Sequence, residues 1–242
     1  METRISLSAL MANLCQRRCS RIKRGVMSLT DTCIILIGPM GVGKTSAAKE
    51  LSEITGLEYI DVDELRWGFF SAQPDYDGEM VDDLFGDSKE EDAFRYMKPF
   101  EARLVLYVLD NYQSGIFDFG AGYTVYDDIE LFEKVKTAFV KYSNVFFLRY
   151  SDDKDESLAA LSERHTDIPK EVYYSLNRGF IESPCNEILA TYTIDTARFI
   201  RNVSRRCLRR RCLTASMSGR FLPAPRGGRQ NSRRLGNKTF SL

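Results

Sequence analysis

The residues with the clearest chemistry form a glycine-rich stretch, "GPMGVGKTS", directly after the apolar run "CIILI". The stretch fits the pattern G-x-x-x-x-G-K-[ST] at every fixed position and stands between an expected strand and an expected helix. Its glycines let backbone N–H groups converge on phosphate oxygens, and the helix adds its positive N-terminal dipole. The pattern predicts a nucleotide-binding loop, with a chance match in a glycine-rich turn as the alternative. The predicted phosphate-binding residues are Gly38, Met40, Gly41, Val42, Gly43, Lys44, Thr45 and Ser46.

Two side chains of this loop have roles beyond holding the phosphates. The Lys44 ammonium would bridge the β- and γ-phosphates, and the Thr45 hydroxyl would ligate a magnesium ion. The sequence therefore predicts ATP and Mg²⁺ as ligands, with Lys44 as a catalytic residue and Thr45 as a metal ligand.

A pair of carboxylates follows the second apolar run, in "YIDVDEL". The alternation of an extended chain puts Asp61 and Asp63 on the same side, at the end of the strand where ligands bind in parallel sheets. One carboxylate would hold Mg²⁺, which uses few protein ligands and keeps several waters, and the other would orient an acceptor hydroxyl. The alternative is a pair of exposed turn acids.

A third candidate segment is "IFDFGAGYTVYDD", after the third apolar run. Gly120 and Gly122 would let a bound substrate approach the backbone closely, and Asp118 lies at the end of the strand. A tight turn without a ligand is the alternative.

The elements that must position these residues alternate between strand and helix. This alternation predicts an α/β fold with a parallel sheet and helices on both faces. The expected strands lie in "TCIILI", "EYIDV", "SGIFDF", "NVFFLRY" and "ATYTID". The expected helices cover residues 45–54, 93–111, 127–142, 157–164 and 171–176.

These features, in this order, resemble the shikimate kinase family and its nucleoside-monophosphate-kinase-like relatives. The matching elements are "GPMGVGKT", the "DVD" of Asp61–Asp63, the "FR" of Phe94–Arg95, the "GAG" of Gly120–Gly122 and "SPCNEILATYTIDT". The resemblance covers about residues 31–197. It implies a three-layer P-loop NTPase fold with a five-stranded parallel sheet and a helical lid.

The resemblance also implies roles for individual residues. Asp61 would lie near Mg²⁺, and Asp63 would contact the acceptor hydroxyl. Arg95 would pair with an anionic group of the acceptor, because a guanidinium fork suits a carboxylate. Arg164 would reach the transferring phosphate from the lid, between residues 161 and 181. Apart from the resemblance, Arg178 is a second lid arginine that would supply, from a displaced position, the positive charge missing at Glu182. Gly120 and Gly122 would line the acceptor pocket.

The chain departs from the family pattern at three positions. Glu182 stands where the family has an acceptor-binding arginine, Asn186 where it has a tyrosine, and Ala121 at the middle glycine. A glutamate would repel a carboxylate, so a small-molecule kinase of this architecture is the better-supported interpretation than shikimate kinase itself. The segment between Asp63 and Arg95 is also longer and more acidic than in the family.

Charge divides the chain into three parts, although its 34 basic and 34 acidic residues balance. Residues 1–30 hold six basic residues and one acid, which is typical of a disordered leader or an organelle transit segment. Residues 204–242, rich in Arg, Gly and Ser, are expected to be a disordered tail, with nucleic-acid binding as a less favoured role. Residues 31–203 form the expected kinase domain.

Composition excludes some classes of protein. The six cysteines form no CxxC pair and the chain has one histidine, His165, which argues against a zinc site. No apolar run reaches the roughly 20 residues of a membrane span. A cytoplasmic location is expected, with organelle targeting as the alternative; the sequence predicts no oligomeric state.

The leading hypothesis is ATP-dependent phosphorylation of a hydroxyl on a small molecule. A second keeps the fold and changes the acceptor to a nucleoside, a nucleotide or another uncharged hydroxyl compound. A third is an ATP-binding regulatory protein whose basic tail engages nucleic acid.

Overall fold

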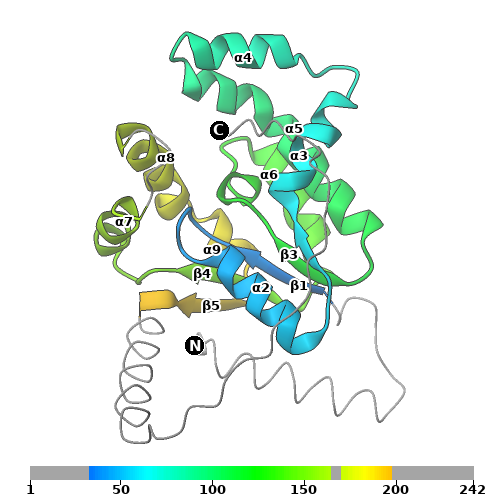
Figure 1. Cartoon of the computed structure of the whole chain (residues 1–242), viewed down its shortest axis with the longest axis vertical. Coiled ribbons are helices and arrows are strands. Elements are labelled where there is room, and N and C mark those ends of the chain that lie inside the picture. Colours follow the sequence, from blue (N-terminus) through cyan, green and yellow to red (C-terminus); the bar gives the residue numbers. More distant parts are fainter. Residues whose placement is uncertain (1–32, 165–169, 198–242) are drawn as a thin grey trace, which may run out of the picture. The chain divides into compact units, whose positions relative to one another are not determined.

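Five strands form a parallel sheet in the computed structural model, which describes residues 33–164 and 170–197 (Figure 1). Their order across the sheet is β2-β3-β1-β4-β5. The register pairs Asp118 with Leu36 on one side and with Asp61 on the other, so the predicted carboxylates lie at one edge of the sheet. The strands are β1 (Cys33–Ile37), β2 (Tyr59–Asp61), β3 (Gly115–Asp118), β4 (Val145–Arg149) and β5 (Tyr192–Asp195).

Both faces of the sheet are buried, which explains the continuous apolar runs in the sequence. Along β1, Ile35 and Ile37 pack into the core on one face, whereas Ile34 and Leu36 pack into the core on the other. Because successive side chains of a strand point to opposite faces, β1 needs apolar residues at every position.

Helices cover the two faces and complete three layers. Helix α2 (Lys44–Thr55) packs on the face of Ile34 and Leu36 through its buried alanines and Leu51. The opposite face is covered by α5 (Glu90–Asn111), α6 (Ile129–Phe139) and α9 (Cys185–Leu189). The predicted three-layer fold with a five-stranded parallel sheet is confirmed.

The lid predicted after β4 consists of two helices that pack on each other, α7 (Lys154–Ser162) and α8 (Lys170–Glu182). The sequence pattern predicted a helix over residues 171–176 for α8, but the helix continues through the "NRGFIE" segment to Glu182. The glycine in that segment, Gly179, is not among the glycines with positive φ and does not interrupt the helix.

The acidic segment after Asp63 contains two helices that sequence analysis did not predict, α3 (Val62–Ser71) and α4 (Gly78–Gly86). Each begins at an aspartate whose carboxylate accepts a backbone hydrogen bond, Asp61 for α3 and Asp77 for α4. Both helices pack against α5. The segment is therefore a folded layer over α5, and the turn η2 (Ala121–Thr124) after β3 completes this side.

The leader at residues 1–30, the tail at 204–242 and His165 lie outside the described residues. The bounds of the expected kinase domain, 31–203, stay a prediction. In the described part of the chain, no helix is both long enough and apolar enough to span a membrane.

The packing of β3 gives a direct test of this core. Phe117 is fully buried, so Phe117→Ala should lower the free energy of unfolding by about 3–5 kcal/mol through lost burial and the cavity left behind. Urea denaturation measures the loss. Val140→Ala, at a side chain that is 81% exposed, serves as the control and should change stability by less than about 0.5 kcal/mol. Equal effects of the two substitutions would contradict this assignment of the core.

Candidate active site

The loop between β1 and α2 has a backbone that only glycine adopts easily. Gly38, Gly41 and Gly43 have φ angles of 140°, 72° and 101°, all in the left-handed region. At Gly38 a side chain would also collide with the backbone oxygen of Leu148 on β4. The sequence pattern of glycines thus corresponds to a loop folded tightly over the end of the sheet.

Lys44 lies inside this loop rather than in solvent. Its ammonium donates to the backbone oxygens of Gly38 at 2.9 Å and Pro39 at 3.0 Å, and the residue is only 8% exposed. Burial lowers the pKa of Lys44, while Asp118 and Asp63 oppose this shift by favouring the charged form. The loop therefore holds a cation at its centre, where phosphates of a nucleotide would lie.

Thr45 is hydrogen-bonded to a carboxylate that the sequence placed at the strand end without a role. Its hydroxyl donates to Oδ2 of Asp118 at 2.6 Å. Burial raises the pKa of Asp118, although the hydrogen bond from Thr45 and the charge of Lys44 act in the opposite direction. Asp118 thus joins the candidate site from β3, beside the hydroxyl predicted to bind Mg²⁺.

Asp61, the predicted metal ligand, lies beside Asp118 in the sheet register. One of its oxygens accepts from the backbone N–H of Asp63 at 3.0 Å, and the other accepts from the hydroxyl of Tyr59 at 2.9 Å. Among the described residues, no group of three or more His, Cys, Asp and Glu side chains could hold a metal ion. The set of Thr45, Asp61 and Asp118 suits Mg²⁺, which takes one or two carboxylates together with phosphate oxygens and water.

Asp63 is held by an arginine that sequence analysis did not single out. Arg66 donates to Asp63 at 2.6 Å from one nitrogen and to the hydroxyl of Tyr123 at 2.7 Å from another. A Cβ at Gly120 would lie 2.7 Å from Oδ2 of Asp63. Asp63, Arg66 and Tyr123 therefore form a connected group that packs directly on Gly120.

A second charged pair packs on the other predicted glycine. Lys98 donates to Glu101 at 2.8 Å and to the backbone oxygen of Gly122 at 2.7 Å. Glu101 is 4% exposed, and a Cβ at Gly122 would lie 3.2 Å from its carboxylate. The space at both glycines is thus taken up in part by carboxylates of this chain.

Two arginines predicted to bind ligands instead pair within their own helices. Arg95 lies 3.1 Å from Asp92 on α5, and Arg178 lies 3.0 Å from Glu182 on α8. All four side chains are more than half exposed. The structure does not join these arginines to Asp63, and Glu182, at the family's arginine position, has its charge matched by Arg178.

The lid reaches the phosphate loop through Arg164 and through two residues that sequence analysis missed. Arg164 donates to the backbone oxygen of Gly41 at 3.1 Å, and its guanidinium lies 5.1 Å from the ring centre of Tyr150. On α8, Tyr173 and Asn177 are buried and both bond to the backbone of Met40. The described lid helices thus already lie against the loop.

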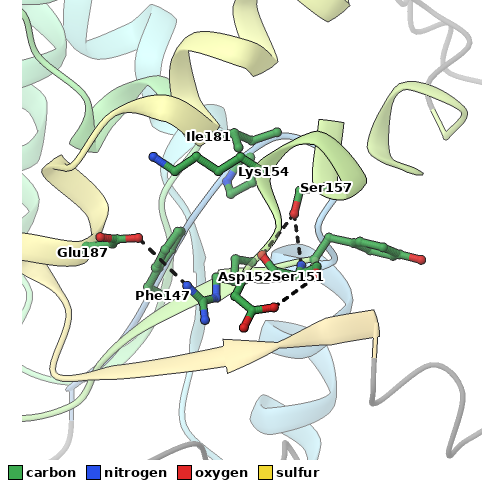
Figure 2. Close-up of a pocket in the computed structure, with 10 residues that line it drawn as sticks. Phe147, Ser151, Asp152, Lys154, Ser157, Ile181 and Glu187 are labelled. Atoms are coloured by element: carbon green, nitrogen blue, oxygen red, sulfur yellow. Dashed lines mark hydrogen bonds and ion pairs between the residues drawn. The ribbon is translucent and has the colours of Figure 1, made fainter. Parts of the chain in front are cut away.

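Figure 2 shows a hollow on the lid side of the loop, where β4, α7 and α8 meet. Arg149, at the end of β4, is committed to Asp195 on β5 at 2.9 Å. The hollow borders the loop at Pro39, and none of Asp63, Arg66 and Tyr123 lines it. Its lining includes Pro39, Phe147, Arg149, Lys154, Ile181 and Glu187.

Comparison with known proteins gives a limited likeness. Among solved structures, the chain is similar to shikimate kinase from Acinetobacter baumannii in complex with shikimate, with 20% sequence identity, coverage of 74% of this chain and 94% of that chain, and a TM-score of 0.44. No protein-family model and no curated protein matches the chain.

The sheet order and the loop between β1 and α2 decide the fold without that likeness. The chain has the P-loop NTPase fold. The five-stranded parallel sheet and the glycine loop after β1 agree with the fold that the resemblance predicted.

The packing of the Asp63 group on Gly120 is testable with a matched pair of substitutions. Gly120→Ala would push its methyl group into Asp63 and Tyr123 and should destabilise the protein by about 1–3 kcal/mol. Gly68→Ala, in the exposed interior of α3 with no atom within 4 Å of the new methyl group, should stabilise it by about 0.5–1 kcal/mol. Thermal melting compares the two, and a stabilising Gly120→Ala would refute this packing.

Proposed function

We propose that the protein is an ATP-dependent phosphotransferase that phosphorylates a hydroxyl group of a small molecule, in the manner of shikimate kinase-like enzymes. The observation that carries this proposal is the buried Lys44 ammonium inside a glycine loop, with the Thr45 hydroxyl on Asp118 beside it. Phosphoryl transfer requires mostly positioning and neutralisation of charge, and this arrangement supplies both.

On the donor side, the backbone N–H groups of the loop would hold the phosphates of ATP. Lys44 would exchange its bonds to Gly38 and Pro39 for phosphate oxygens, which offers a buried ammonium a stronger partner than a carbonyl. Thr45, with Asp118 and Asp61, would hold Mg²⁺, whose charge stabilises the phosphate oxygens when the ion is bound. Arg164 lies at the loop, ready to neutralise charge from the lid side.

On the acceptor side, Asp63 would receive the hydroxyl that attacks the phosphate. Asp63 follows the end of β2, where Asp61 pairs in register with Asp118, the partner of Thr45 in the loop. Arg66 and the hydroxyl of Tyr123 hold the carboxylate of Asp63 in place. A fixed carboxylate can accept the hydroxyl's hydrogen bond and direct its oxygen at the phosphate.

A specific observation favours an uncharged acceptor as the second candidate. Arg66, Lys98 and Arg178 are each paired with a carboxylate of this chain, at 2.6, 2.8 and 3.0 Å. A carboxylate-bearing acceptor would have to compete with these acids for the same cations. A hydroxyl compound without charge can instead accept and donate hydrogen bonds to the pairs as they stand.

Loss of the central cation tests the donor side. Lys44→Ala should weaken MgATP binding about 10–100-fold, because a charge-assisted hydrogen bond to phosphate is worth about 1.5–3 kcal/mol, and should remove turnover. Calorimetric titration of the full chain measures the affinity. Lys49→Ala, at an exposed lysine of the same helix, is the control and should bind MgATP like the wild type. Absence of MgATP binding by the wild type, or unchanged binding by Lys44→Ala, would refute the proposal.

A panel of acceptors separates the two candidates. ATP consumption above the basal rate is measured with shikimate, gluconate, nucleosides and aminoglycosides at equal concentrations. The paired cations lead us to expect stimulation by acceptors without a carboxylate. Selective turnover of shikimate would instead establish the carboxylate-binding candidate.

A further inference from the structure

Two side chains on one face of α8 hold a single residue of the phosphate loop. Asn177 accepts from the N–H of Met40 at 2.9 Å and donates to its carbonyl oxygen at 3.3 Å. Tyr173, one helical turn earlier, donates its hydroxyl to the same carbonyl oxygen at 3.1 Å. Asn177 also donates to the hydroxyl of Tyr173, which makes the two side chains one unit, here named the Met40 clamp.

The two side chains of the clamp are buried and closely packed against the loop. Tyr173 and Asn177 are 1% and 0% exposed. A Cβ at Gly41 would lie 2.7 Å from the hydroxyl of Tyr173, so the loop approaches the helix as closely as a glycine allows. Removal of the Tyr173 hydroxyl would cost the Met40 backbone one of these hydrogen bonds, and removal of the Asn177 amide would cost it two.

The planar peptide bond links the direction of the Met40 carbonyl, which the clamp fixes, to the direction of the next N–H in the loop. The described residues contain no cis peptide, and in a trans peptide the C=O and the N–H point in opposite directions. The carbonyl of Met40 points at α8, so the N–H of Gly41 in the same peptide points away from the helix. Arg164 holds the carbonyl of Gly41 in the same way, which turns the N–H of Val42 away from Arg164.

The preceding peptide is held from both ends. Asn177 accepts a hydrogen bond from the N–H of Met40. The Lys44 ammonium donates to the carbonyl oxygen of Pro39 in the same peptide, at 3.0 Å. The two contacts fix one orientation of this peptide before a ligand binds, and when Lys44 exchanges Pro39 for a phosphate oxygen, Asn177 still holds the peptide from the lid. A loop that has already adopted its orientation loses less entropy when it binds phosphate.

We propose that Tyr173 and Asn177 are positioning residues that orient the N–H groups of the phosphate loop, Gly41 first, toward the phosphates of the nucleotide. This inference rests on the proposed function, since it assumes that the loop binds a nucleotide. It assigns α8 a role in phosphate affinity that is separate from any arginine of the lid.

Matched substitutions in the full chain test the clamp. Tyr173→Phe deletes only the hydroxyl, and Asn177→Leu replaces the amide with an apolar group of similar size. The controls are Tyr174→Phe, a neighbouring tyrosine that is 43% exposed, and Asn186→Leu, at an asparagine with 0% exposure that bonds to Thr124 instead of the loop. Affinities for MgATP and for inorganic tripolyphosphate are measured by calorimetry, with a thermal melt of every variant.

Tyr173→Phe should weaken binding of both ligands about fivefold, and Asn177→Leu about 10–100-fold, as expected for the loss of one and of two hydrogen bonds to the backbone of Met40. Equal losses for tripolyphosphate and MgATP would place the effect at the phosphates. Tyr174→Phe and Asn186→Leu should bind like the wild type even where Asn186→Leu melts at a lower temperature.

Three outcomes would overturn the clamp. One is wild-type affinity in both clamp variants, and another is an equal loss in Asn186→Leu, which would mean that general destabilisation explains the result. The third is tighter binding by the variants, which would mean that the clamp competes with phosphate. In each of these the wild type still binds MgATP, whereas a wild type that binds neither ligand refutes the proposed function itself.

Discussion

Burial of the Lys44 ammonium is the constraint on which the rest of the site depends. A cation removed from water is costly unless fixed partners replace the water. Here the partners are the carbonyl oxygens of Gly38 and Pro39, and the loop can present them because its glycines adopt left-handed backbone angles. Asp118 and Asp63 add opposite charge. The loop, the strand ends and α3 are thus assembled around one positive charge.

The same constraint explains the acids around the loop. The carboxylate of Asp118 is itself buried, and its raised pKa reflects the cost of that burial, which Thr45 and Lys44 partly offset. Asp63 and Glu101 are matched by Arg66 and Lys98. The site is therefore a network of compensated charges. A bound phosphate would join this network by replacing carbonyl oxygens at Lys44, which leaves the ion pairs of Asp63 and Glu101 intact.

Much of this arrangement could be predicted from local sequence. The five strands and the loop follow from apolar runs and glycine spacing, because both faces of the sheet are buried. Asp61 and Asp77 are helix caps followed by acidic residues, which could have indicated α3 and α4. Contacts between side chains far apart in the sequence could not be predicted in this way. Nothing in the spacing of Arg66 and Tyr123, 57 positions apart, indicates that their side chains meet.

The Met40 clamp shows why such contacts matter for the loop. A glycine-rich loop has many backbone conformations, and its sequence pattern alone does not select one. Lys44 donates hydrogen bonds to the carbonyl oxygens of Gly38 and Pro39. The lid donates to the next two, from Tyr173 to Met40 and from Arg164 to Gly41. Each of the four successive carbonyls therefore has a donor. Because the carbonyls of Met40 and Gly41 point to the lid, the N–H groups of Gly41 and Val42 in the same peptides point the opposite way, and an anion is the ligand that such N–H groups attract.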